Sequence, residues 1–99
     1  MAYKILWSPE ALGDLPALTA FIAQDNPDAA ERMGLAILGR VRQLEQHPLI
    51  GRKVPETNDP RVRETIESPY RIVYRLNQRE RVAEVLRVWH GARGTPEIE

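Results

Sequence analysis

Arginine dominates the residues of this chain that are suited to chemistry, and its distribution is uneven. Residues 51–99 contain nine arginines and one lysine against eight acidic residues, whereas residues 1–50 contain four basic residues against six acidic ones. The guanidinium group is planar and permanently charged, so it suits phosphate and carboxylate partners. The second half of the chain is therefore where we expect a functional site, although pairing with glutamates across neighbouring strands explains such arginines equally well.

Three residues of this half are candidates for catalysis. Arg71 can stabilise negative charge on a phosphate or a transition state, and its structural alternative is a place on a solvated strand face. His90 can act as a general acid or base near neutral pH, although a lone histidine without an orienting partner is more often structural. Glu56, in a loop, is either the matching base or a solvated side chain. The residue types are thus present, but their convergence depends on the fold.

Trp89 directly precedes His90 and has two interpretations. Its ring can stack on a nucleic-acid base, but packing against the helices is the better interpretation. The chain has no cysteine and only two histidines, so thiolate metal sites, disulfides and cysteine nucleophiles are excluded and a metal site is not expected. Phosphate loops, serine triads and dinucleotide fingerprints are also missing. We therefore expect neither a metal nor a cofactor.

The totals predict one soluble domain, residues 1–99, in the cytoplasm. Hydrophobic residues make up 42% of the chain and charged residues 28%, and its formal net charge is zero. No apolar run is long enough to span a membrane, and charge and proline arrive at Pro9-Glu10, before a signal-peptide core can form. A chain without net charge has no global field that attracts nucleic acid.

The region from Arg61 to Gly91 reads as a small sheet. Residues 70–76 alternate between apolar residues and the set Arg71, Val73 and Arg75, which is typical of a half-buried strand. A second apolar run, Val82–His90, follows the polar connection Asn77–Glu80, so the two runs predict a β-hairpin. Arg61–Glu67 is a third strand candidate. We expect the face with Arg71 and Arg75 to be open to another macromolecule.

The first half of the chain predicts a strand and two helices. The strand is Tyr3–Trp7, and Ser8-Pro9 then starts a helix in which Pro16 should cause a kink or a restart. Asn26-Pro27 starts the second helix, which should run to about His47 with an apolar stripe. The stripe consists of Ala30, Met33, Ile37, Val41 and Leu44. The short link between the helices makes them antiparallel neighbours.

Two segments lack periodicity. Breakers mark Leu49–Pro60 as a loop, and the tail Gly91–Glu99 should fray. Gly34 and Gly39 either allow close helix approach or are merely tolerated. The resulting fold class is α+β, in the order β-α-α-β-β-β, with a helical hairpin on one face of a small, mainly antiparallel sheet.

Several short motifs in this order resemble the RelE/ParE superfamily, the toxins of bacterial type II toxin–antitoxin modules, often called plasmid stabilisation proteins. The resemblance covers residues 3–93 and implies the same β-α-α-β-β-β fold. The motifs are Trp7–Ala11, Asp14-Leu15, His47-Pro48, Gly51-Arg52, Val54–Glu56, Arg63-Glu64, Tyr70–Arg75 and Val88–Arg93.

One branch of the superfamily cuts mRNA on the ribosome. By motif position, Glu56, Arg71 and His90 match the glutamate, arginine and histidine of YoeB-type members, which implies an endoribonuclease with these catalytic residues. In-line attack by a 2′-hydroxyl needs a base, charge stabilisation and a leaving-group acid. The chain departs from this branch at Gly91, which stands where a terminal tyrosine is expected, and it lacks a lysine-rich surface.

A second branch, ParE-like, inhibits DNA gyrase and needs no nuclease site. The ending Val85–Arg93 is more similar to this branch, so the resemblance favours a gyrase inhibitor over an mRNA interferase, with a non-toxic binding module as the remaining alternative. The residues expected to bind a macromolecule are Arg52, Arg63, Arg75, Arg87, Trp89 and Arg93.

The resemblance also implies a protein partner. A toxin of this kind is held by a cognate antitoxin whose C-terminal segment wraps it with a helix, a strand or both. The arginine-bearing sheet face and the groove beside the helical hairpin are complementary to an acidic, amphipathic peptide. We expect a tight complex with a short protein encoded upstream.

Overall fold

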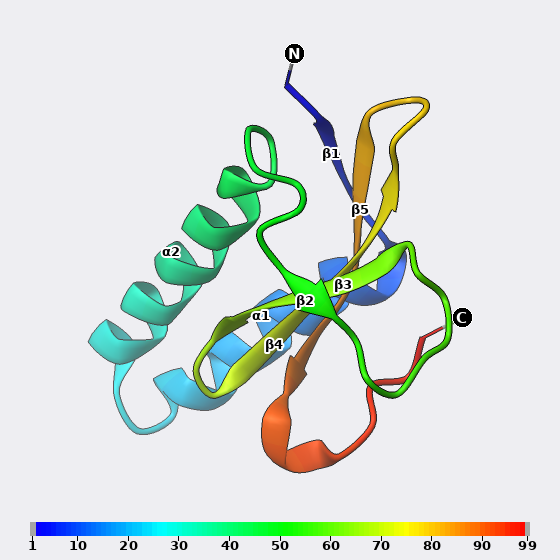
Figure 1. Ribbon diagram of the computed structural model, residues 1–99. Helices are drawn as coiled ribbons and strands as arrows, with labels where there is room; N and C mark the ends of the chain where they lie inside the picture. Colours follow the sequence, from blue (N-terminus) through cyan, green and yellow to red (C-terminus); the bar gives the residue numbers. More distant parts are fainter. Residues whose placement is uncertain (1, 99) are drawn as a thin grey trace.

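Two helices cover one face of a five-stranded sheet in the computed structural model, which describes residues 2–98 (Figure 1). The strand order is β1-β5-β4-β3-β2, with β1 parallel to β5 and the other pairs antiparallel. This confirms the α+β class. The elements are β1 (Lys4–Trp7), α1 (Pro9–Ala23), α2 (Pro27–Gln43), β2 (Arg52–Lys53), β3 (Val62–Glu67), β4 (Tyr70–Asn77), β5 (Val82–His90) and the 3₁₀ helix η1 (Gly91–Arg93).

Helix α1 begins where the sequence predicts. The Ser8 hydroxyl accepts a hydrogen bond from the amide of Ala11 at 3.0 Å and donates one to the carbonyl of Leu86 on β5 at 2.8 Å, so the cap also fixes the helix to the sheet. The expected restart at Pro16 is wrong, because α1 is continuous from Pro9 to Ala23. Ala11 and Leu18, on either side of the proline, are buried in the core, and their packing compensates for one lost backbone bond.

Helix α2 is shorter than predicted. Its cap is Asn26, as expected, but it ends at Gln43 rather than near His47. The following turn buries Leu44 completely and lets the carbonyl of Glu45 accept a hydrogen bond from the amide of Tyr3 at 2.7 Å. The end of α2 is therefore set by its contact with the start of β1.

None of the helices described is long and apolar enough to cross a membrane.

The two helices pack as antiparallel neighbours, and the glycines of α2 differ. A Cβ atom added at Gly34 would lie 3.4 Å from the Thr19 side chain of α1, which is close to ordinary van der Waals contact, so the helix approach leaves room for a methyl group there. A Cβ at Gly39 would meet nothing within 4 Å, so this glycine is merely tolerated.

The sheet carries a buried apolar cluster on each of its two faces, which the alternation pattern did not predict. Toward the helices, the buried cluster consists of Ala11, Leu18, Ile37, Val41, Tyr70, Ile72, Val85 and Val88. On the opposite face, a second cluster consists of Val54, Val62, Val73 and Leu86, with Ile98 packed against it. The tail therefore folds back over the sheet instead of fraying, and it covers part of the face that we expected to be open.

The segment that follows α2 is anchored to the sheet by Tyr74 and Gly51. The hydroxyl of the fully buried Tyr74 accepts a hydrogen bond from the amide of Gly51 at 3.0 Å and donates one to the carbonyl of Pro48 at 2.9 Å. The next two residues form β2, an edge strand that the loop prediction missed. A Cβ atom at Gly51 would lie 2.5 Å from the carbonyl oxygen of Glu64 and from the Tyr74 hydroxyl.

This contact leaves no room for a side chain at Gly51. We expect Gly51→Ala to lower the free energy of unfolding by about 2–3 kcal/mol, because the backbone must move away from β3 and Tyr74. The matched control Gly39→Ala should raise it by about 1 kcal/mol, since that helix position is open. Urea denaturation measures both values, and a Gly51→Ala midpoint equal to that of the wild type would contradict the packing.

Candidate functional site

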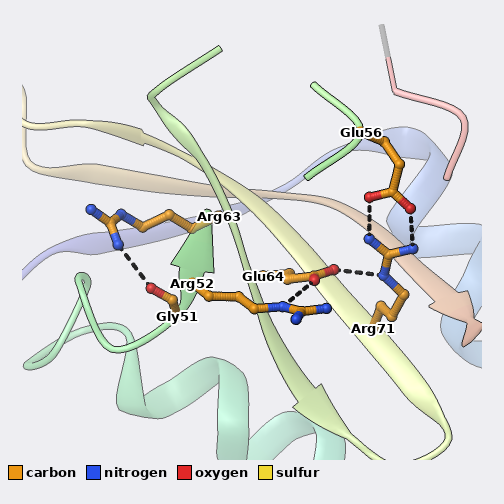
Figure 2. A network of polar contacts seen from close by, with 6 residues as sticks. All are labelled: Gly51, Arg52, Glu56, Arg63, Glu64 and Arg71. Atoms are coloured by element: carbon orange, nitrogen blue, oxygen red, sulfur yellow. Dashed lines mark hydrogen bonds and ion pairs between the residues drawn. The ribbon is translucent and has the colours of Figure 1, made fainter. Parts of the chain in front are cut away.

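A network of four charged side chains occupies the sheet face opposite the helices (Figure 2). Glu64 lies at its centre and receives hydrogen bonds from the Nε atoms of Arg52 at 2.7 Å and Arg71 at 2.6 Å. The other two nitrogens of Arg71 donate to the carboxylate of Glu56 at 2.7 and 2.8 Å. Arg71 therefore has two carboxylate partners, one from β3 and one from the loop after β2.

The strand register explains this arrangement. Glu64 pairs with Arg52 of β2 and with Val73 of β4 across the ladders, so these three side chains point to the same face. Arg71 lies two residues before Val73 on β4, so its side chain points to that face as well. The Glu64 side chain is fully buried and that of Arg71 is 12% exposed. An ionised carboxylate so deep in the protein is tolerated only when it is paired and hydrogen-bonded. The two arginines meet that requirement for Glu64.

The pairing of Glu56 with Arg71 stabilises the charged form of each side chain. Hydrogen bonds from Arg71 lower the pKa of Glu56 below its ordinary value, against a smaller opposing effect of burial. The two hydrogen bonds to Glu56 raise the pKa of Arg71, and the one to Glu64 adds to this effect. Our expectation that Arg71 would lie on an open face is therefore wrong, because the side chain is turned into the network and is largely neutralised there.

His90 does not join Glu56 and Arg71. It pairs with Tyr70 in the β4–β5 ladder, whereas Arg71 pairs with Trp89, so alternation directs His90 toward the helix side. Its ring meets the Tyr70 ring edge-on at 5.2 Å, and its Nδ1 accepts a hydrogen bond from the amide of Ala92 at 3.0 Å. The structure thus brings together two of the three candidate catalytic residues.

Trp89 packs on the face away from the helices, which corrects the expectation of a helix contact. It is 2% exposed, and its Nε1 donates to the carbonyl of Gly94 at 3.2 Å. The guanidinium groups of Arg87 and Arg93 lie 4.7 and 3.9 Å from the centroid of its ring. Stacking on a nucleic-acid base is therefore blocked by the protein itself.

The remaining predicted binding arginines also have partners within the chain. Arg87 forms two hydrogen bonds with Asp14 of α1, at 2.8 and 2.9 Å, and this pairing raises the pKa of Arg87. Arg75 forms an ion pair with Glu84 at 3.5 Å. Arg63 donates to the carbonyl of Gly51 at 2.8 Å. Pairing with a glutamate across neighbouring strands, the structural alternative expected for these arginines, holds for Arg75, whereas Arg87 pairs with an aspartate of α1 and Arg63 with a backbone carbonyl.

Two acids that organise the site were missed as site residues. Glu64 was expected only as one of several cross-strand partners. Asp14 also accepts from the backbone amide of Val88 at 3.0 Å, so it closes the β5 edge beyond the end of β1. The sequence feature that could have identified Asp14 is its helical spacing from the apolar Ala11 and Leu18, because an acid is unusual on a buried helix face.

Among residues 2–98 there is no cluster of three or more metal-ligating side chains.

A second feature of the molecule is an apolar groove between α1 and α2, about 600 Å³ in volume, which we call the hairpin groove. Leu35 and Leu38 line it and remain 63% and 45% exposed. Its other lining residues are Leu15, Pro16, Thr19, Ala20, Ala23, Ala30, Glu31 and Gly34. Exposed apolar surface of this kind typically marks a binding site.

A family model and two similar proteins all point to the same family of toxins. A model of the ParE toxin of type II toxin–antitoxin systems (parDE) matches residues 5–94. The protein Y4kP of Sinorhizobium fredii is 33% identical over 99 residues, which are 96% of this chain and 95% of the relative. Toxin RelE2 of Caulobacter vibrioides is 30% identical over 90 residues, which are 91% of this chain and 97% of the relative.

Solved structures share the fold. The chromosomal ParDE toxin–antitoxin system of P. aeruginosa contains a chain with a TM-score of 0.71 and 24% identity, covering 90% of this chain and 96% of that one. The toxin–antitoxin complex RelBE2 of Mycobacterium tuberculosis gives a TM-score of 0.66 and 21% identity, covering 91% and 99% of the two chains.

The pairing of Glu56 with Arg71 should be visible in the pH dependence of stability. Because the pKa of Glu56 is lowered in the folded state, the pair stabilises fully above the ordinary value of 4.5 and is lost as the pH falls through the lowered pKa. We expect Glu56→Gln to be less stable than the wild type at neutral pH, with a difference that shrinks in acid. Urea denaturation across this pH range measures the difference, and a constant difference would contradict the assignment.

Proposed function

Because this chain belongs to the ParE toxin family of type II toxin–antitoxin systems, within the RelE/ParE superfamily, we propose that it arrests growth by inhibiting DNA gyrase. In this proposal it acts in the cytoplasm, as a binding protein and not as a nuclease. Mechanistically, it would hold gyrase through protein–protein contacts and would need neither a metal nor a cofactor.

One observation carries the choice of gyrase over mRNA. Cleavage by a 2′-hydroxyl needs a base, an acid and a positive group around one phosphate. Arg71 instead has two carboxylates around it, with its side chain 12% exposed, and His90 is directed to the other face of the sheet. The three guanidinium nitrogens of Arg71 already donate to Glu56 and Glu64, and the partly exposed carboxylate of Glu56 repels a phosphate that approaches them.

Ribosome-dependent mRNA cleavage is the second candidate function. The observation that favours it is the contact between Glu56 and Arg71, two residues that match the YoeB-type motif, together with the similarity to a relative named RelE2. In this alternative, Glu56 is the base, Arg71 stabilises the phosphorane, and His90 must turn toward them.

We expect the purified protein to block supercoiling by gyrase, and His90→Ala to block it equally well, because the His90 ring packs on Tyr70 and caps η1, away from the network around Arg71. A supercoiling assay on relaxed plasmid measures this, with the protein omitted as the baseline. If gyrase is unaffected while ribosome-bound mRNA is cut, and His90→Ala abolishes that cleavage, the nuclease function replaces this proposal.

The cognate antitoxin is the second partner in the proposal. The hairpin groove supplies a place for an amphipathic helix, because it is apolar, open and lined by exposed leucines of α2. Burial of Leu35 and Leu38 would then contribute most of the affinity, since each leucine loses apolar surface to the partner.

We expect Leu35→Glu to abolish co-purification with the protein encoded by the neighbouring reading frame, because it places a charge in the apolar groove. Leu12→Glu is the matched control, since Leu12 is 59% exposed on α1 and does not line the groove. Tagged co-expression followed by gel filtration measures the complex. Equal recovery of the partner with both variants would exclude the hairpin groove as the helix site.

A further inference from the structure

Several basic side chains of this protein lie around a groove away from Arg71. At the other end of the sheet, the β4–β5 turn, the start of β3 and the segment around β2 surround a groove of about 760 Å³, which we call the cationic groove. Five basic residues line it against two acidic ones. The basic residues are Lys53, Arg61, Arg63, Arg75 and Arg79, and the acidic residues are Glu80 and Glu84.

The partners of these residues show where charge is available. Arg61 is paired with Asp59, and Arg75 with Glu84. Within residues 2–98, by contrast, Lys53 and Arg79 form no ion pair, and Arg63 donates only to a backbone carbonyl. Three cations around one groove therefore have no carboxylate partner, unlike Arg52, Arg71 and Arg87 on the rest of the sheet.

Apolar side chains line the same groove as these cations. Leu6 is 42% exposed and Leu49 is 54% exposed, and both line the cationic groove together with Leu76 and Val82. No aromatic ring is among the lining residues, so the groove lacks the stacking surface with which proteins hold single-stranded bases. A groove lined by both cations and aliphatic side chains instead matches a peptide that carries both carboxylates and aliphatic residues.

We propose that the cationic groove binds an acidic, extended segment of the antitoxin whose aliphatic side chains pack on Leu6 and Leu49. This inference rests on the proposed toxin–antitoxin function and adds a second contact to the hairpin groove, with which the cationic groove shares no lining residue. Two sites joined by one chain raise the overall affinity without requiring either contact to be strong. The carboxylates of the segment pair with Lys53, Arg63 and Arg79.

The test is charge reversal at the two exposed cations that have no ion pair. In Lys53→Glu/Arg79→Glu, we expect the affinity for the protein encoded by the neighbouring reading frame to fall by about tenfold or more, chiefly through slower association. The dependence of the wild-type affinity on salt should also become weaker in this variant. Surface plasmon resonance at two salt concentrations measures both effects.

The matched control is Arg32→Glu/Arg42→Glu on α2. It makes the same change in net charge at exposed residues that line neither groove, and its affinity should stay near that of the wild type. Circular dichroism checks that both double variants are folded. Equal affinities for the groove variant and the wild type would overturn the inference and leave the proposed function intact.

Two further outcomes are distinguishable. If the groove variant keeps its affinity for the antitoxin but loses binding to a DNA or RNA oligonucleotide that the wild type binds, the groove is a nucleic-acid surface and the inference is overturned. If the wild type itself does not bind the neighbouring protein, the proposed pairing with an antitoxin fails, and the inference fails with it.

Discussion

The buried carboxylate of Glu64 is the interaction on which the sheet face opposite the helices depends. A charge without exposure is stable only if its partners are fixed in place, because an uncompensated buried ion costs several kcal/mol. Arg52 and Arg71 are those partners, and they tie the edge strand β2 and the central strand β4 to β3. Arg71 in turn holds Glu56, so the loop after β2 is fixed to the sheet by the same network.

This network changes what the arginine-rich half of the chain offers to other molecules. Most arginines on the sheet neutralise acids of the same chain, as Arg71 does with Glu56 and Arg87 does with Asp14. A nuclease needs positive charge that is directed at a phosphate, whereas a binding protein needs complementary surfaces. Two surfaces that stay open are an apolar groove on the helices and a cationic groove at the turn between β4 and β5, and both suit recognition of a protein.

Local signals predicted the elements of the fold well. Ser8 and Asn26 cap the two helices because a short polar side chain before proline satisfies free backbone amides, and this chemistry needs no tertiary contact. Alternation predicted β4 and β5 because side chains on a strand point to opposite faces. The errors lie where packing overrides local preference: α1 continues through Pro16, α2 stops at the docking point of β1, and Ile98 of the tail packs on the sheet.

By itself, the sequence determined the order of the elements, the helical hairpin, the toxin superfamily and the residue types at the candidate site. Only the tertiary structure decided which of those residues meet. Strand register and loop position bring Glu56 and Glu64 to Arg71, and the same register directs His90 to the other face. The reason is physical: helix caps and alternation act within a few residues, whereas an ion pair joins groups far apart in the chain. Its geometry depends on strand register, which no local pattern specifies.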